Sequence, residues 1–552
     1  FILIDAETSM ALGSETHLGD LGDPSMEYML ARCQQSQILL EEIQTFKGKD
    51  FDEQLDLDLM GRHLQQMIFF YQLQQHGKPQ RCSQPNGVDG ISAGIFQLFV
   101  NDERSPELRL NNILTRLQQA PNYLAIESKV ILEPIARWRD IELEQGASLP
   151  DLFETILQWA KAENYPDLDS LIDAIGECNK ALTKYLKILK TKKTHKAFDI
   201  GLNKVNELLG IRQIPYSPAE LKIMARDFMS DTQCLLKKLT KKLSVKYGLP
   251  ENTSEVDLHE FLNERFAATL IDGNLSSVLD YYEQQINSIQ DFVEKNKLFC
   301  IPSEQNMKIM QTPNFLEPVI PAGAMWPPLA LREGKKTSLV YLTLKKDQLA
   351  EHTKLGIPVM MIHEGIPGHH LQFATAAQHA SFIRRIFSAN EHAEGWTTML
   401  EDYMLDVGYI SEDLVDEVRF IAKREMSRLV ARVGIDLYFM TNDTTYLELG
   451  LDLTFNSEDV FVNAAKLLKA ATGFTDGRVQ AELNWYSSEQ SYPLSYLTGN
   501  RMVWQLKEDI ISANKKKLNK LALDQAFHEV YLKSGCMPVE SLRSVFVNLG
   551  YL

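Results

Sequence analysis

The sequence predicts a mainly α-helical protein that contains one small β-sheet. Apolar residues recur at helical spacing through most of residues 26–298. Prolines then interrupt any helix between residues 302 and 328, and the segment Ser338–Leu344 is rich in residues that favour strands. We therefore expect a small sheet within residues 299–345, followed by helices to the end of the chain.

Three regions follow from this pattern. Residues 1–25 carry turn-forming residues and little periodicity, which predicts an N-terminal tail. Residues 26–298 form a helical region that we expect to wall a cleft, and residues 299–552 form a third region that holds the small sheet and the helices after it. Within the helical region, Ser217 is followed by a proline and by Glu220, which is typical of a helix start.

The composition excludes several classes of function. The 57 basic and 74 acidic side chains give a net charge of −17, so no basic excess is present to neutralise the phosphates of a nucleic acid. The six cysteines are scattered without a Cys-x-x-Cys pair, which argues against a cysteine zinc site. No stretch approaches the ~18 consecutive apolar residues that a membrane span needs.

The stretch from His363 to His370 carries the strongest chemical signal. It holds three of the twelve histidines of the chain, beside Glu364 and directly after an apolar segment. Burying a histidine and a glutamate at a helix end is costly, and a bound divalent metal ion is the simplest compensation. The pattern is similar to the His-Glu-x-x-His zinc signature, but Pro367 occupies the place of the second histidine.

A metal site in this stretch requires a broken helix. On an unbroken helix His370 would lie ~10 Å from His363 along the axis, and His369 would point ~120° away. Pro367 has no N–H and clashes with the carbonyl group of residue 363, while the glycines on either side of it add backbone freedom. We therefore predict that the regular helical hydrogen bonds stop between Gly365 and His369.

The motif His-Glu-x-x-Pro-Gly-His-His resembles that of the DUF885 family of mostly bacterial proteins. Other segments match this family as well: Glu394-Gly395-Trp396 with Glu401, Leu494-Ser495-Tyr496 with Gly499, and Phe527-His528 with Gly535-Cys536-Met537-Pro538. The resemblance implies a large helical, zincin-like metallohydrolase of the gluzincin type, with the small sheet next to the metal-binding helix. Residues 299–552 would then form the zincin-like catalytic region. Family members often carry signal or lipoprotein leaders, which implies a place in the bacterial cell envelope and a lipid anchor on a removed leader.

The candidate ligands for one zinc ion are His363, His369 and Glu394. His369 is preferred to His370 because a bulge from i+4 to i+6 is the smaller distortion; His370 then bonds the developing oxyanion or supports a ligand. Catalytic zinc usually has three protein ligands and an open position, and a glutamate on the next predicted helix completes the set. Spacing alone leaves two competitors for this third ligand, Glu391 and His392. The resemblance decides for Glu394.

The candidate catalytic residues surround these ligands. Glu364 adjoins a ligand, where a carboxylate can take a proton from a metal-bound water and pass it to the leaving amine. Glu401 lies on the same helix face as Glu394 and would orient a ligand histidine. The hydroxyl groups of Tyr486 and Tyr496 are candidate hydrogen-bond donors to the oxyanion.

These residues predict a zinc-dependent hydrolase that cleaves peptide or related amide bonds without a covalent intermediate. Two alternatives stay open: a non-catalytic, metal-binding scaffolding protein, and an amidase that acts on non-peptide amides.

Departures from the family pattern favour the scaffolding alternative somewhat. The glycine and the histidine that usually follow Asp436 are absent from Leu437–Met440, and Gln490-Ser491-Tyr492 replace a Pro-Gly-Gln run. Trp485 stands where the family has an arginine, and Leu483–Tyr496 holds neither arginine nor lysine. We therefore expect weak dependence on the free C-terminal carboxylate of a peptide.

Overall fold

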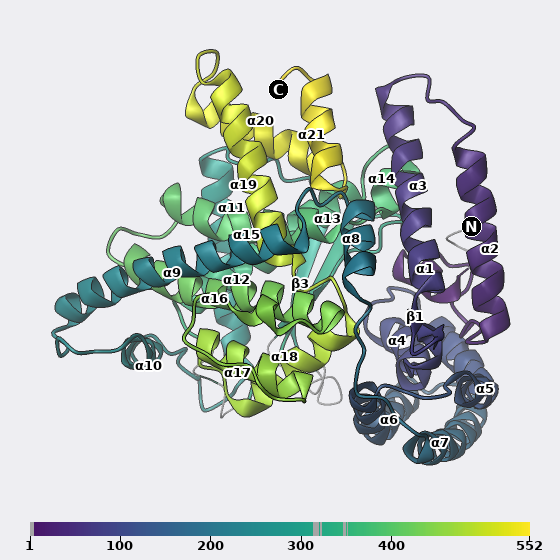
Figure 1. Ribbon diagram of the computed structural model, residues 1–552. Helices are drawn as coiled ribbons and strands as arrows, with labels where there is room; N and C mark the ends of the chain where they lie inside the picture. Colours follow the sequence, from purple (N-terminus) through teal and green to yellow (C-terminus); the bar gives the residue numbers. More distant parts are fainter. Residues whose placement is uncertain (1–4, 313–319, 321–322, 346–348, 350–351) are drawn as a thin grey trace.

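The computed structural model describes residues 5–312, 320, 323–345, 349 and 352–552 (Figure 1). Helices make up most of these residues, and a small sheet lies among them, so the predicted mainly α-helical class is confirmed. The first half of the chain contains the helices α1 (Ala6–Ala11), α2 (Met26–Ile43), α3 (Phe51–Gln72), η2 (Gln80–Cys82), α4 (Gly87–Val100), α5 (Pro106–Val130), α6 (Ala136–Ala162), α7 (Leu168–Thr191), α8 (Leu202–Ile211), α9 (Pro218–Tyr247), α10 (Glu255–Arg265) and α11 (Ser277–Lys295).

From Gly356 onward the chain is mainly helical to its end. The second half contains the helices α12 (Gly356–Glu364), α13 (His369–Ala376), α14 (Phe382–Ile386), α15 (Asn390–Asp406), α16 (Val415–Thr441), η5 (Thr444–Leu447), α17 (Val460–Thr472), α18 (Asp476–Ser488), α19 (Ser495–Asn514), α20 (Lys520–Lys533) and α21 (Val539–Asn548). In Figure 1 the pair α2–α3 and the group α4–α7 lie on one side of the molecule and most of the later helices lie on the other, while α8 and α14 contact α3.

The expectation of an N-terminal tail is wrong. Helix α1 begins after an Asp5 cap, and Met10 is buried in the core of α4–α7. Leu18 and Leu21 are buried in the same core, and Arg116 of α5 donates a hydrogen bond of 2.7 Å to the carbonyl oxygen of Leu18. Residues 5–25 are therefore an ordered segment packed against α4–α7, which we call the N-terminal strap. Arg116 stabilises it by binding one of its backbone carbonyl groups.

The predicted start of the long helix α9 is confirmed. The Ser217 side chain accepts from the backbone N–H of Glu220, and the Glu220 side chain accepts from the N–H of Ser217, which is a complete capping box. The helix ends at Tyr247 and is capped by Gly248 in the left-handed conformation, where a side chain would be strained. Helix α9 packs along α16, which carries residues next to the candidate site.

Within the residues that the structure describes, the small sheet has three strands in the order β3 (Gln305–Gln311), β5 (Lys336–Leu342), β4 (Gly323–Trp326). β3 runs parallel to β5, with Gln305 opposite Lys336, and β4 runs antiparallel to β5. The predicted strand Ser338–Leu344 is therefore the central strand, displaced by two residues. A second, two-stranded ribbon that the sequence did not predict joins β1 (Gln74–Gln75) to β2 (Lys78–Pro79).

One hydrophobic core joins the two main predicted regions. Val278, Tyr282 and Ile289 of α11 pack in the same cluster as Met361 of α12 and Trp396 of α15. The predicted boundary at residue 298 lies in the connection between α11 and β3, where the chain continues through this common core. None of the helices in the described part of the chain is long and apolar enough to cross a membrane.

Candidate metal centre

The helix break predicted between Gly365 and His369 is confirmed. Helix α12 ends at Glu364 and α13 begins at His369. A Cβ atom on Gly368 would lie 1.9 Å from the carbonyl oxygen of His363, so the turn closes only with glycine at this position. The indole N–H of Trp396 donates a hydrogen bond of 2.9 Å to the carbonyl oxygen of Pro367 and fixes the turn from α15.

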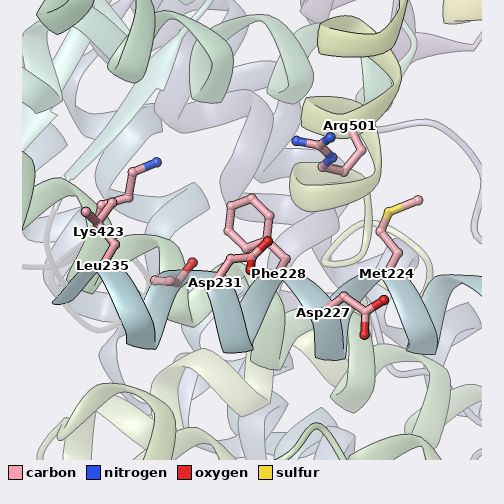
Figure 2. Close-up of a pocket in the computed structure, with 8 residues that line it drawn as sticks. Met224, Asp227, Phe228, Asp231, Leu235, Lys423 and Arg501 are labelled. Carbon is pink, nitrogen blue, oxygen red and sulfur yellow. The ribbon is translucent and has the colours of Figure 1, made fainter. Parts of the chain in front are cut away.

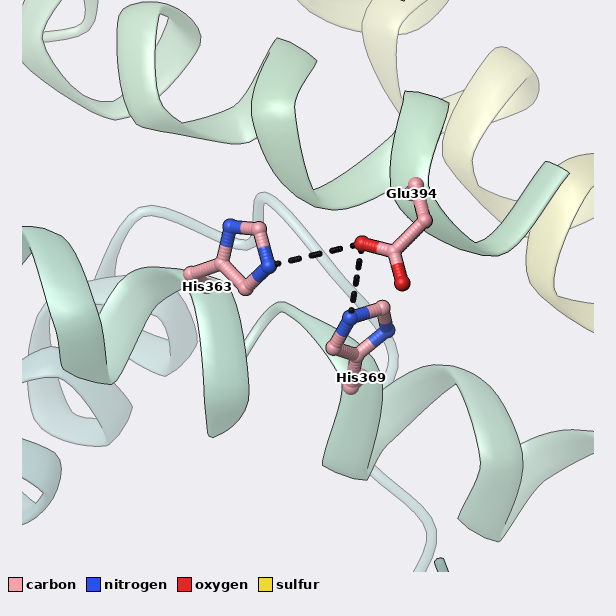
Figure 3. Close-up of side chains that lie close together, drawn as sticks. All are labelled: His363, His369 and Glu394. Carbon is pink, nitrogen blue, oxygen red and sulfur yellow. Dashed lines mark ion pairs between the residues drawn. The ribbon is translucent and has the colours of Figure 1, made fainter. Parts of the chain in front are cut away.

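The break brings His363, His369 and Glu394 together from three helices (Figure 3). Their ligand atoms all lie within 4.8 Å of one another. Glu394 Oε2 is 3.7 Å from His363 Nε2 and 3.4 Å from His369 Nε2. Two ligands at ~2.0–2.1 Å from a tetrahedral zinc ion are ~3.4 Å apart, so this spacing fits a zinc ion closely.

The donor set also fits a cation chemically. Glu394 Oε2 is buried and accepts no hydrogen bond from any residue in the described ranges. A buried carboxylate oxygen without a partner is costly, and a metal ion bound between the three side chains would satisfy it. The side chains of His363, His369 and Glu394 are 15%, 9% and 4% exposed, so the ligand set reaches solvent mainly through His363.

Glu401 lies where the sequence predicts. Glu401 lies two helical turns after Glu394 on α15, and its Oε1 is 2.7 Å from His363 Nδ1. This hydrogen bond holds the His363 ring with Nε2 toward Glu394, which is how a carboxylate commonly orients a metal-binding histidine.

The charges of the cluster are strongly coupled. Burial alone would lower the pKa of His363, but the carboxylates of Glu394 and Glu401, one beside each ring nitrogen, raise the pKa to about 10. Burial would likewise raise the pKa of Glu394, but the neighbouring His369 and His363 bring that pKa well below its usual range. The two carboxylates therefore favour the protonated form of the His363 ring, and a metal ion at Nε2 would compete with that proton.

Glu364 and Tyr496 lie near the cluster, because the charge of Glu364 acts on His363 and that of Glu394 acts on Tyr496. Glu364, the last residue of α12, is half-buried and makes no hydrogen bond or ion pair with the residues that the structure describes. Tyr496, on the first turn of α19, also has a hydroxyl group without a hydrogen-bond partner in the described chain. Burial and then the negative charge of Glu394 raise the pKa of Tyr496, so its hydroxyl stays protonated and can donate.

The expectation for Tyr486 is corrected by its contacts. Its hydroxyl donates to Glu482 Oε2 at 2.6 Å and accepts from Arg432 Nε at 2.9 Å. The ring is fully buried. Because this hydroxyl is already committed inside an ion-pair cluster, it does not serve as a donor to a substrate oxyanion.

The expectation for His370 changes as well. His370 Nε2 donates to the side-chain oxygen of Gln305 at 2.6 Å, and Nδ1 accepts from the Ser338 hydroxyl at 2.8 Å. Burial lowers the pKa of His370 to about 4, which keeps the ring neutral. Both ring nitrogens are therefore used to fasten α13 to β3 and β5, and we no longer expect His370 to contact the reacting atoms.

Sequence reasoning missed Tyr492 and Arg432. The Tyr492 hydroxyl donates to Glu394 Oε1 at 2.7 Å. The Arg432 guanidinium lies 5.1 Å from the Trp485 ring centre and 4.4 Å from that of Tyr496. The run of aromatic residues between Trp485 and Tyr496 is a signal that could have indicated Tyr492, whereas nothing local connects Arg432 to this segment.

A separate cavity of about 320 Å³ lies between α9, α16 and α19 (Figure 2). Arg501 projects from α19 toward α9, which carries Asp227, Phe228 and Asp231 along this wall. The cavity lining contains none of the candidate ligands, so this cavity is distinct from the metal centre.

Comparison with known families decides the membership of the chain. The model of a family described as "Bacterial protein of unknown function (DUF885)" matches residues 7–545. The chain belongs to the DUF885 family. The comparison with curated proteins gives no match.

Two solved structures share the fold of this DUF885 protein. One is described as a "putative lipoprotein of unknown function from Shewanella oneidensis"; it is 17% identical, with a TM-score of 0.74 over 98% of this chain and 96% of its own. The other, "the putative lipoprotein from Colwellia psychrerythraea", is 16% identical, with a TM-score of 0.76 over 99% of this chain and 95% of its own. At these identities the likeness establishes a common fold and nothing about activity.

Proposed function

We propose that this DUF885 protein is a zinc-dependent hydrolase of peptide or related amide bonds, with a zincin-like arrangement of its metal centre. One observation carries the proposal: Glu394 Oε2 is buried without a hydrogen-bond partner among the described residues, and it faces two histidine nitrogens at 3.4 and 3.7 Å. A bound zinc ion supplies Lewis acidity, which lowers the pKa of a water molecule to about 7 and polarises a carbonyl group.

The residues of the chain divide the remaining work. Glu364 lies beside His363 with an unengaged carboxylate, so it can accept a proton from the attacking water and give it to the leaving amine. Tyr496 offers an unengaged, protonated hydroxyl to the developing oxyanion. Glu401 keeps the His363 ring in position through its 2.7 Å hydrogen bond. The unengaged Glu364 carboxylate and Tyr496 hydroxyl support hydrolysis, because a purely structural metal site would need neither of them.

The test is turnover of a mixed peptide library by zinc-loaded protein, with and without a chelator, for the natural chain and Glu364→Gln. We expect the chelator to abolish cleavage, and Glu364→Gln to lose it by about 10²–10⁴-fold while keeping its zinc. Equal turnover in both proteins would contradict the role of Glu364. A natural chain that binds zinc without cleaving any peptide would favour the scaffolding alternative or, if it cleaves a panel of non-peptide amides, the amidase alternative.

We also propose that the protein resides in the bacterial cell envelope. The support is the family resemblance together with the descriptions of the two structural neighbours, each of which is called a "putative lipoprotein". Fractionation of cells that express the natural gene tests this proposal. Recovery with the envelope fraction is expected, and recovery with the cytoplasmic fraction alone would contradict it.

A further inference from the structure

The two oxygens of the Glu394 carboxylate have different surroundings. Oε2 faces the two histidines, whereas Oε1 accepts a hydrogen bond of 2.7 Å from the Tyr492 hydroxyl. We propose that Tyr492 is a positioning residue of the metal centre, which holds Glu394 so that it offers one oxygen, Oε2, to the metal ion. This inference rests on the metal centre of the proposed function.

The phenol is suited to this role because it remains a donor. The ordinary pKa of a phenol is about 10, so its hydroxyl is protonated at neutral pH and can donate. A neutral phenol beside an ionised carboxylate makes a charge-assisted hydrogen bond. Turning Oε1 toward the metal ion would break this bond inside a mostly buried site, so the one-oxygen orientation is favoured.

The segment that carries Tyr492 is itself fastened to two other helices. Asp436 of α16 is fully buried and accepts hydrogen bonds from the backbone N–H groups of Ser491, at 2.9 Å, and Leu494, at 3.0 Å. Arg212, which follows α8, donates to the carbonyl oxygen of Ser491 and to Glu391 Oε1, each at 2.5 Å. The backbone on either side of Tyr492 is therefore bound, by Asp436 at Ser491 and Leu494 and by Arg212 at Ser491. These contacts keep the Tyr492 hydroxyl next to Glu394.

Ser491 adopts a backbone conformation that favours glycine. Its φ is +71°, in the left-handed region that side chains rarely occupy. The turn places Ser491 N–H toward Asp436 while Tyr492 points back to α15. A β-branched residue would not tolerate this φ, so position 491 gives a way to disturb the segment without removing the Tyr492 hydroxyl.

The first experiment measures the zinc dissociation constant by competition with a chromophoric chelator, at fixed pH, for the natural chain, Tyr492→Phe and Tyr496→Phe. Tyr496 is the matched control for zinc affinity, because it is a neighbouring tyrosine whose hydroxyl does not bond to a ligand. We expect Tyr492→Phe to bind zinc at least about tenfold more weakly, and Tyr496→Phe to change affinity by less than about threefold. Affinity in Tyr492→Phe within threefold of the natural chain would overturn the inference.

A second pair of variants keeps the test valid if Tyr492→Phe folds poorly. Ser491→Gly relieves the positive φ and should retain the natural zinc affinity, whereas Ser491→Val should weaken it although Tyr492 is intact. Equal affinity in Ser491→Val would overturn the role of the fastened segment. His363→Ala tests the metal centre separately from the role of Tyr492. If this variant binds zinc as tightly as the natural chain, the proposed metal centre is wrong, and the inference about Tyr492 is wrong with it.

Discussion

At the scale of single residues, the choice between neighbouring side chains decides which groups act. His369 and His370 are adjacent, yet one faces Glu394 and the other is bound by Gln305 and Ser338 of the sheet. Tyr486 and Tyr496 likewise differ in what their hydroxyl groups already contact. The free groups are those that we assign to the chemistry.

The two tyrosines give a residue-scale prediction. Tyr496→Phe should lower kcat by about 10²-fold or more, since it removes one donor to the oxyanion, with little effect on stability. Tyr486→Phe should instead lower the free energy of unfolding by about 1–3 kcal/mol, because Arg432 and Glu482 each lose a buried partner. Kinetics and denaturant unfolding on the same preparations check this. Loss of turnover in Tyr486→Phe at natural stability would reverse the two assignments.

At the scale of elements, the site depends on how closely α15 and α19 pack. A Cβ atom on Gly395 would lie 2.4 Å from the backbone of Gly499, and one on Gly499 would lie 2.2 Å from the carbonyl oxygen of Glu391. The two glycines therefore let the helix with Tyr496 approach the helix with Glu394. Their appearance in the family motifs has a packing reason.

Gly395→Ala tests this helix contact. The added methyl group meets backbone, which cannot move locally, so we expect a loss of stability of about 1–3 kcal/mol and weaker zinc binding. Gly176→Ala in α7 is the matched control, because nothing lies within 4 Å of its Cβ position and alanine favours a helix by up to ~1 kcal/mol. Thermal unfolding of both variants decides. Equal or greater stability in Gly395→Ala would contradict the close contact.

Trp485 of α18 and Tyr496 of α19, whose rings are in contact, bear on substrate recognition. Arg432 does reach Trp485, which the local sequence gave no reason to expect. Its charge, however, is paired with Glu482 at 3.1 Å, and the side chain is only 6% exposed. We therefore still predict that peptides with amidated C-termini are cleaved within about tenfold of the free acids, under ~1.4 kcal/mol in transition-state binding. Cleavage rates for matched amidated and free-acid peptides test this. If amidation abolishes cleavage, a basic residue such as Arg432 binds the C-terminal carboxylate of the peptide and the prediction is wrong.

At the scale of the whole molecule, buried charges outside the site couple folding to pH. Glu142 of α6 accepts hydrogen bonds of 2.8 Å from the backbone N–H of Val88 and from the Tyr185 hydroxyl, and so joins α4, α6 and α7. Burial raises the pKa of Glu142 to about 7. The folded chain thus binds a proton that the unfolded chain releases at lower pH.

The sign of the effect follows from this difference. Between the ordinary carboxyl pKa of 4.5 and about 7 the folded state holds more protons, so this group's contribution to stability falls as pH rises through that interval. The loss is at most about 3 kcal/mol, and it levels off above pH ~7. Glu142→Gln keeps both acceptor contacts without the titration, so its unfolding free energy should change less between pH 4.5 and 7. Identical pH slopes in both proteins would contradict the shifted pKa.

The sequence predicted the features that depend on neighbouring residues. These include the break at Pro367, the helix start at Ser217 and the central strand. It did not predict contacts that the fold makes between distant segments: Tyr492 reaches Glu394 across 98 positions, and Arg212 reaches Ser491 across 279. The N-terminal strap was missed for the same reason, because its partner Arg116 lies 98 residues further on.

Zinc content tests the central claim most directly. After dialysis against buffer with trace zinc, elemental analysis should give about one zinc per chain for the natural protein and for His370→Gln, whose ring belongs to the sheet contact. His363→Ala, His369→Ala and Glu394→Ala should each retain little zinc while keeping their far-ultraviolet circular dichroism. Full zinc content in a folded His369→Ala variant, or its loss in a folded His370→Gln variant alone, would contradict the metal centre that we assign.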